Sequence, residues 1–293
     1  MINFRELHDL ALRLAKEPPF TADNLYVDLL LTITLGEIQS EFDFILKGGT
    51  AIVKVWMQPY RFSYDLDFSY FAPGDPRKHY KKYQLSLKEK LTSLGFNINE
   101  KGEETHRSGG RIFILHLMDG GKYLKRPVKL SISSIDPAPC FPPVKQKFKT
   151  IVPISKPEFK LLYPDLVPKM IKTEANVLTI EELCAEKIRA LATRGTEEGW
   201  SLLLRDVFDL YMMDSQGILD KALSSESGQK CIKHKFSAIK GTNYWKKFQD
   251  FQKADPKVKI REEDQAIFFN PRLLTEKKAE DIIRKIQTAL IAL

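Results

Sequence analysis

Two short runs of sequence, Leu46-Lys47-Gly48-Gly49-Thr50-Ala51 and Arg61-Phe62-Ser63-Tyr64-Asp65-Leu66-Asp67-Phe68, decide the fold that we expect. Residues 42–46 predict a short strand that ends at the Gly-Gly pair, and residues 50–56 are long enough for two helical turns. Residues 63–70 predict a second strand. The order strand, turn, helix, strand is typical of an α/β domain.

Two carboxylates stand side by side on the second predicted strand. Residues i and i+2 of a strand point the same way, so Asp65 and Asp67 lie next to each other. Their negative charges repel, and in the local sequence only Arg61 offsets this. A hard divalent cation, Mg²⁺ or Mn²⁺, would relieve the repulsion, and magnesium takes carboxylate and phosphate oxygens as ligands.

The Gly48-Gly49 turn offers backbone N–H groups at a helix start, where a phosphate can approach closely, and Thr50 adds a hydroxyl donor. The alternative is an ordinary glycine turn followed by a strand that ends in exposed acids. Each half of the pattern, taken alone, favours that alternative, because Gly-Gly and Asp-x-Asp are both common.

Together and in this order, the two runs resemble the polymerase-β-type nucleotidyltransferases, and specifically the AbiEii-type toxins, which include the MenT toxins. The resemblance covers roughly residues 25–75. It implies that the turn holds the triphosphate of an NTP donor and that Asp65 and Asp67 bind the metal. The residues that we expect to bind the nucleotide in this part of the chain are Lys47, Gly48, Gly49, Thr50, Arg61 and Ser63.

A second motif is centred on Lys187. Residues 180–192 predict a helix whose apolar stripe includes Cys184, Ile188 and Leu191, and Lys187 falls inside that stripe. A lysine there is costly to bury and should engage an anion, whereas a lysine at the margin of the stripe would snorkel to solvent. Residues 186–191 also look like the third motif of the family, whose lysine contacts the nucleotide.

The fourth motif, Arg-Asp-x-x-Asp-Leu, resembles residues 205–210. We expect Asp206 at the flank of an apolar helix face, where it would act as a base or as an orienting group. Asp209 is expected on the far side, in a simple ion pair with Arg205. The stretch between the third and fourth motifs is longer than the family pattern.

One position departs from the superfamily. Many of these enzymes carry a third carboxylate on a later strand that faces the first two. The matching strand here is residues 128–134, and the matching residue is Ser131. The enzyme therefore works with two metal carboxylates, or this strand alignment is wrong, or the active site is weakened or dead.

Positive charge is concentrated in one stretch, residues 122–172, which we call the basic band. It contains eleven lysines and arginines against three acidic residues, a local excess equal to the net charge of +8 of the whole chain. Such a band suits a polyanion, because each neutralised phosphate releases counterions. A solvated lysine face without a partner is an equally good interpretation of charge alone.

The rest of the chain completes an α/β (α+β) fold. We predict helices at residues 21–38 and 78–94, the latter ending at Gly95, and strands at residues 111–118 and 128–134. Half of the prolines lie in residues 137–168, which predicts a connection with some edge strand. Residues 179–182 form a capping box that opens a helix. We expect a nucleotidyltransferase domain with a mixed sheet at residues 1–150 and a mainly helical domain at 151–293 that closes the cleft.

Composition is that of a soluble globular protein, with 43% hydrophobic and 29% charged residues. We expect no signal peptide, no membrane span and a cytoplasmic location. The cysteines, Cys140, Cys184 and Cys231, are odd in number and widely spaced, which favours reduced thiols over disulfides or a zinc site.

Three functions follow. The first, from the resemblance, is an AbiEii-like toxin of a toxin–antitoxin pair that transfers a nucleotide to RNA, with tRNA 3′ ends favoured, and that has a cognate antitoxin. The second is a nucleotidyltransferase that acts on a small molecule or a protein and has no need of the basic band. The third is a non-catalytic RNA- or partner-binding relative, for which Ser131 is the best argument.

Overall fold

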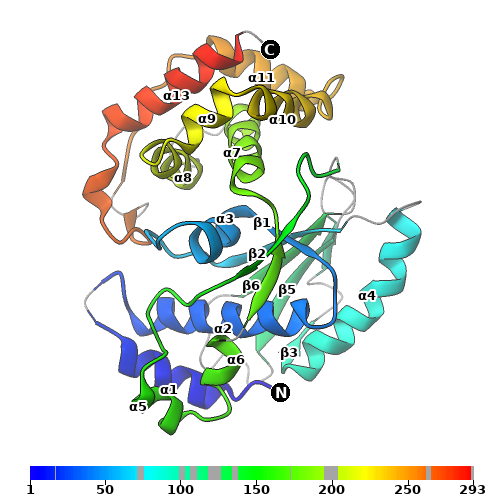
Figure 1. Cartoon of the computed structure of the whole chain (residues 1–293), viewed down its shortest axis with the longest axis vertical. Helices are drawn as coiled ribbons and strands as arrows, with labels where there is room; N and C mark the ends of the chain where they lie inside the picture. Colours follow the sequence, from blue (N-terminus) through cyan, green and yellow to red (C-terminus); the bar gives the residue numbers. More distant parts are fainter. Residues whose placement is uncertain are drawn as a thin grey trace. The chain divides into compact units, whose positions relative to one another are not determined.

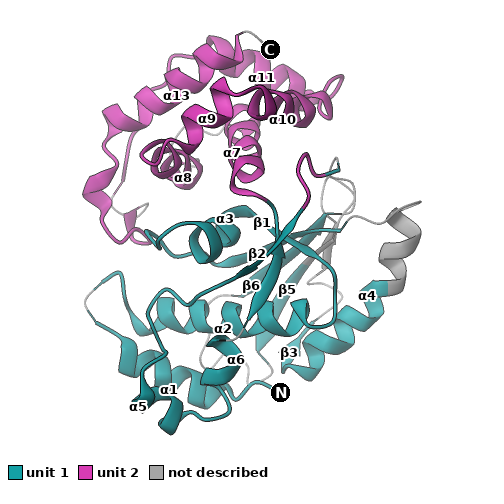
Figure 2. Cartoon of the chain, viewed as in Figure 1, with its two compact units in different colours: residues 1–138, 143–178 teal, residues 139–142, 179–293 magenta. Residues whose placement is uncertain are grey.

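The computed structural model describes residues 1–16, 18–70, 76–98, 103–105, 111–117, 127–133, 138–171, 173–194, 204–261 and 265–291. The chain divides into two compact units (Figure 2). Unit 1 contains residues 1–138 and 143–178, and unit 2 contains residues 139–142 and 179–293. The described residues contain no helix with the length and apolar character that a membrane crossing requires.

Unit 1 is built on an eight-stranded mixed sheet (Figure 1). The strands follow the order β3-β5-β6-β2-β1-β8-β7, and β4 pairs with β5. Their bounds are β1 Ile45–Lys47, β2 Asp65–Ser69, β3 Phe96–Asn97, β4 Glu103–Thr105, β5 Arg111–Leu117, β6 Val128–Ser133, β7 Val144–Lys147 and β8 Glu174–Val177. β2 is antiparallel to β1 and parallel to β6, and β1 is parallel to β8.

Helices surround this sheet. They are α1 Phe4–Leu14, α2 Ala22–Gln39, α3 Gly48–Ala51, the π-helical η1 Ile52–Trp56, α4 Pro76–Ser93, α5 Pro157–Leu162 and α6 Val167–Ile171. α2 begins at its N-cap Thr21, whose hydroxyl accepts the Asn24 N–H, and α2 packs against α1, α6, β2 and β8. Gly95, with φ +101°, follows α4 as expected.

Unit 2 is mainly helical in its described residues. It contains α7 Ile180–Arg194, α8 Leu204–Asp214, α9 Ile218–Ser224, α10 Glu226–Ser237, α11 Asn243–Lys253, the 3₁₀ turn η4 Pro271–Leu273 and α13 Glu276–Leu290. α7 is the central element and contacts α8, α9, α10 and α11. The Thr179 hydroxyl caps α7 by accepting the Glu182 N–H at 3.3 Å, which is one of the two hydrogen bonds of the expected capping box. The Glu182 carboxylate accepts the N–H groups of residues 140 and 141.

The boundary that we expected after residue 150 falls instead after residue 178. The reason is strand pairing. β8 pairs with β1 in the middle of the sheet and β7 pairs with β8, so most of the proline-rich connection belongs to unit 1. Residues 139–142 leave it and pack within unit 2.

Candidate active site

The two aspartates lie on the polar face of β2. Leu66 and Phe68 are fully buried on the other face, whereas Asp65 and Asp67 are partly exposed. β6 shows the same alternation, with Leu130 buried. This pattern confirms the predicted strand and places both carboxylates on one side of the sheet.

Gly48 brings the turn against one of these carboxylates. Its φ is +70°, a conformation that side chains rarely adopt, and a Cβ at this position would lie 2.5 Å from Oδ2 of Asp67. Glycine is therefore required for two separate reasons. The absence of a side chain is what allows the Asp67 carboxylate to lie directly on the backbone that begins α3.

Gly49 makes room for Arg61 in the same way. A Cβ there would lie 2.5 Å from Nη2 of Arg61. The arginine is 3% exposed, and its Nη1 donates to the carbonyl oxygen of Phe62 at 2.8 Å. The guanidinium group of Arg61, the one positive charge near the acidic pair in the local sequence, therefore lies against the Gly48-Gly49 turn.

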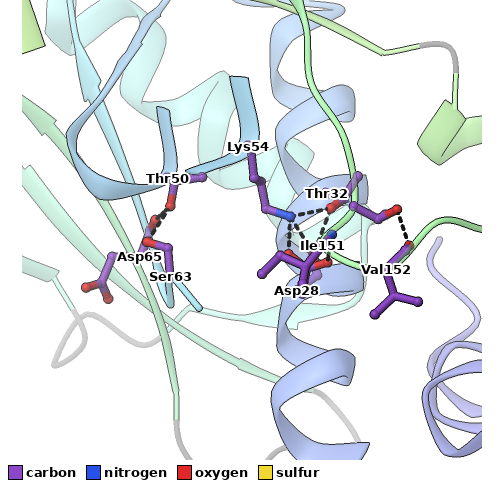
Figure 3. Close-up of polar contacts among 9 residues, drawn as sticks. Asp28, Thr32, Thr50, Lys54, Ser63, Asp65, Ile151 and Val152 are labelled. Atoms are coloured by element: carbon purple, nitrogen blue, oxygen red, sulfur yellow. Dashed lines mark hydrogen bonds and ion pairs between the residues drawn. The ribbon is translucent and has the colours of Figure 1, made fainter. Parts of the chain in front are cut away.

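Thr50 fastens the turn to the start of β2 (Figure 3). Its hydroxyl lies 2.8 Å from Oγ of Ser63 and donates to the backbone carbonyl of Asp65. Thr50 is 1% exposed. A hydroxyl has one proton, so while it donates to the carbonyl it accepts from Ser63. The hydroxyls of Thr50 and Ser63 therefore hold the Gly48-Gly49 turn in position relative to the start of β2.

Ser131 lies opposite Asp67, as the strand alignment predicted. The two residues are register partners on the parallel strands β2 and β6, and the Ser131 hydroxyl donates to Oδ1 of Asp67. Ser131 therefore faces the acidic pair, which is the position that the strand alignment gave it. Lys47 is the partner of Asp67 on the other side, so Lys47, Asp67 and Ser131 form one row across three strands.

These residues fit a hard divalent cation. The donors are the oxygens of two carboxylates with a serine hydroxyl beside them, which is the ligand chemistry of Mg²⁺ or Mn²⁺. The Asp67 carboxylate lies where a side chain on residue 48 would be, so the missing Cβ lets it approach the turn.

A buried ion pair stands behind the turn and was missed by sequence reasoning. Lys54 on η1 meets Oδ1 of Asp28 on α2 and donates to the Thr32 hydroxyl at 2.8 Å (Figure 3). The other carboxylate oxygen of Asp28 accepts the Ile151 N–H at 2.9 Å. Burial lowers the pKa of Lys54, and the charge of Asp28 opposes this shift. The sequence signal for this ion pair was a single charged residue, Asp28 or Lys54, within each of two otherwise apolar runs.

Lys187 engages two carboxylates within unit 2. Its Nζ lies 2.5 Å from Oδ1 of Asp206 and 2.8 Å from Oδ2 of Asp209. Arg194 adds a contact of 3.3 Å to the other oxygen of Asp206. The lysine side chain is 13% exposed. The interpretation that it engages an anion is confirmed, and these anions are supplied by the protein itself.

The expectation for Asp209 was wrong. Its side chain is completely buried and pairs with Lys187, whereas Arg205, its expected surface partner, is exposed. α8 turns both acids of the fourth motif toward α7, because a spacing of three residues keeps them on neighbouring parts of one helix face. Residues 195–203, which make the separation between the two motifs longer than expected, lie outside the described residues.

The basic band is partly described. Its exposed members are Lys129, Lys145, Lys147, Lys156, Lys160 and Lys169, and Lys149 is half-buried. Lys122, Lys125, Arg126 and Lys172 lie outside the described residues. Lys145 and Lys147 stand two residues apart on β7, the edge strand of the sheet, and Lys129 is the register partner of Asp65. One lysine of the band therefore lies beside the acidic pair.

Comparisons with known proteins give the family and the fold of the chain. The family model described as "Nucleotidyl transferase AbiEii toxin, Type IV TA system" matches residues 30–286. No curated protein matches the sequence. Among solved structures, the nucleotidyltransferase toxin MenT4 from Mycobacterium tuberculosis H37Rv aligns with a TM-score of 0.53 at 17% identity, over 98% of this chain and 90% of that one. At this identity the likeness shows a shared fold.

Proposed function

Because the chain belongs to the AbiEii family of nucleotidyltransferase toxins of type IV toxin–antitoxin systems, we propose that it transfers a nucleotide from an NTP to an RNA acceptor. The observation that carries this proposal is the Gly48–Asp67 contact. It joins the Gly48-Gly49 turn to the acidic pair Asp65 and Asp67, on one face of one sheet.

Asp65 and Asp67 would hold a divalent cation, with Mg²⁺ favoured and Mn²⁺ as its substitute. When bound, the ion supplies the charge that polarises the α-phosphate of the NTP. Lys47, Gly48 and Gly49 would bind the triphosphate, since backbone N–H groups at a helix start suit an anion. Thr50, Arg61 and Ser63 support this binding by fixing the shape of the turn. All of them lie in unit 1.

Unit 2 supplies the third and fourth motifs. From the motifs that they match, Lys187 would contact the nucleotide, and Asp206 would accept or orient the proton of the attacking hydroxyl. Their mutual contact of 2.5 Å orients both side chains before substrate arrives. Arg194 adds a second cation to the same carboxylate.

RNA, with tRNA 3′ ends favoured, is the proposed acceptor because of the basic band. Lys145 and Lys147 present two exposed charges along a sheet edge, and Lys129 presents one beside Asp65. Lysines so placed neutralise phosphates of a polyanion. A cognate antitoxin would be the protein partner, as in a type IV system, and the cytoplasm would be the place of action.

The acceptor is tested by incubating the chain with total RNA, Mg²⁺ and each α-labelled NTP in turn, followed by a denaturing gel. We expect label at the size of tRNA with one preferred NTP. Label on a protein or a small molecule would replace the RNA assignment with that acceptor. No label in any fraction from folded protein would favour the non-catalytic relative, for which the serine opposite Asp67 is the structural argument.

A further inference from the structure

Two cysteines that are far apart in the sequence meet in unit 2. The sulfur atoms of Cys140 and Cys231 and a carboxylate oxygen of Glu182 all lie within 4.8 Å of one another. The Cys140 thiol donates to the backbone carbonyl of Cys231 at 3.8 Å. Cys140 is partly exposed, whereas Cys231 is 2% exposed. One thiol is therefore accessible to a small reagent, and the other lies directly behind it.

The protein holds this pair in place with a buried clamp. The Glu182 carboxylate is fully buried and accepts the backbone N–H groups of Cys140 at 3.1 Å and of Phe141 at 3.3 Å. Lys235 neutralises it at 2.5 Å and also contacts Glu186 at 3.2 Å. A short segment between β6 and β7 is thereby fixed on α7 and α10, with its cysteine beside Cys231.

We propose that Cys140 and Cys231 form a redox modification site, a dithiol that hydrogen peroxide oxidises reversibly to an intramolecular disulfide. The Cys140 thiolate attacks a peroxide oxygen and breaks the O–O bond, which gives a sulfenic acid and hydroxide. The Cys231 sulfur then attacks the sulfenic sulfur and displaces its hydroxyl group. Two thiols and one peroxide give one disulfide and two waters. A disulfide needs a sulfur separation of about 2 Å, so the Cys140 side chain must rotate toward its partner.

The surroundings distinguish the three cysteines in reactivity. A hydrogen bond with Cys231 lowers the pKa of the Cys140 thiol, and the Lys235 charge acts in the same direction. Burial and the charges of Glu182 and Glu186 oppose this shift without reversing it. Burial raises the pKa of Cys184 to about 12, and this residue is fully buried. Because the thiolate is the reactive form, Cys140 is the first point of attack and Cys184 stays inert.

A metal ion is the competing occupant of the same cluster, since two thiolates and a carboxylate are zinc ligands. The geometry favours the dithiol. Oε1 of Glu182 meets both Lys235 and a backbone N–H, and Oε2 meets a second N–H. A cation would have to displace an ammonium group that is already 2.5 Å from that carboxylate.

The disulfide would close a covalent loop that runs through both units. Residues 139–142 pack in unit 2, while the chain on either side of them packs in unit 1. The Cys140–Cys231 disulfide would link residues 139–142 covalently to α10, which carries Cys231. Oxidation would thereby fix a connection that otherwise rests on hydrogen bonds to Glu182.

The test treats the reduced full chain with hydrogen peroxide, blocks the remaining thiols with an alkylating reagent and maps peptides without reduction. We expect the number of free thiols to fall from three to one, a linked Cys140–Cys231 peptide, and full recovery with dithiothreitol. Cys184→Ser should form the same link, whereas Cys140→Ser should keep all its thiols. None of these readouts depends on nucleotide transfer, so they stand apart from the proposed function.

Two results would overturn the proposal. The first is peroxide treatment that leaves all three thiols free, or that converts Cys140 to a sulfinic acid while Cys231 remains alkylated. The second comes from adding ZnCl₂ to the reduced chain. Tight, stoichiometric zinc binding that protects Cys140 and Cys231 from peroxide would show that the cluster is a metal site.

Discussion

Oδ2 of Asp67 lies 2.5 Å from the position that a Cβ on Gly48 would occupy, so one carboxylate oxygen takes the space of a missing side chain. The two residues come from β2 and from the turn after β1, which are antiparallel neighbours. This contact makes the backbone that begins α3 and the acidic strand parts of one site. It also ties the identity of residue 48 to the position of Asp67.

Gly48→Ala is expected to lose nucleotide transfer and to destabilise the fold. The substitution forces alanine into a left-handed conformation, which costs about 1–2 kcal/mol, and it also pushes the Asp67 carboxylate away. Chemical denaturation and the transfer assay measure the two effects.

Gly217→Ala is the matched control, because Gly217 has φ +71° and, apart from its chain neighbours, nothing within 4 Å of its Cβ position. It should show the conformational cost alone, with transfer intact. Equal losses of stability in the two variants, with transfer retained in Gly48→Ala, would mean that the Gly48–Asp67 contact is not needed for activity.

Ser131→Asp is expected to increase the stabilisation that Mg²⁺ gives. A third carboxylate beside Asp67 adds repulsion when the ion is absent and adds a ligand when it is present. The melting temperature with and without MgCl₂ measures this. Ser131→Asn, similar in size and uncharged, should not show the gain. The same Mg²⁺ response in all three proteins would mean that position 131 does not face the ion.

Lys187→Met is expected to destabilise the fold by about 3–5 kcal/mol, because it removes the ammonium group that contacts the fully buried Asp209. Lys187→Met combined with Asp209→Leu should recover most of that loss, since apolar residues can replace a buried pair. If Lys187 also contacts the nucleotide, the double variant should fold and remain inactive. Full transfer by the folded double variant would limit Lys187 to a structural role.

Lys145→Gln with Lys147→Gln is expected to weaken RNA binding and to reduce its dependence on salt. Two lost phosphate contacts should lower the slope of log K against log salt by about 1.5. Lys257→Gln with Lys259→Gln is a matched pair with the same spacing and exposure outside the basic band, and it should change neither quantity. Identical salt slopes for the wild type and both double variants would mean that Lys145 and Lys147 do not contact RNA phosphates.

Much of the site was predictable because its signals are local. Glycines at the end of a strand indicate the turn, and carboxylates at i and i+2 of the next strand indicate the acidic pair. The strand register places Ser131 opposite Asp67, as the strand alignment predicted. Pairings between segments that no motif of the resembled family connects were not predictable. The sequence showed a charge in each of two apolar runs, but not that Lys54 and Asp28 pair.

The same limit applied to residues that tertiary packing brings together. Nothing near Cys140 pointed to Cys231, and the helix pattern alone assigned Asp209 to the surface, where the contact with Lys187 overrides it. The unit boundary moved for the same reason, because β8 finds its partner β1 across more than a hundred residues.

The rate of nucleotide transfer by Asp67→Asn, compared with wild type at saturating Mg²⁺ and NTP, tests the central claim most directly. Asparagine keeps the shape and an acceptor for the Ser131 hydroxyl, so melting should be nearly unchanged. Transfer should fall by about a thousand-fold or more, because a metal supplies several kcal/mol of transition-state stabilisation. Asp165→Asn, at an exposed position, should match wild type. A folded Asp67→Asn that transfers at the wild-type rate would contradict the account.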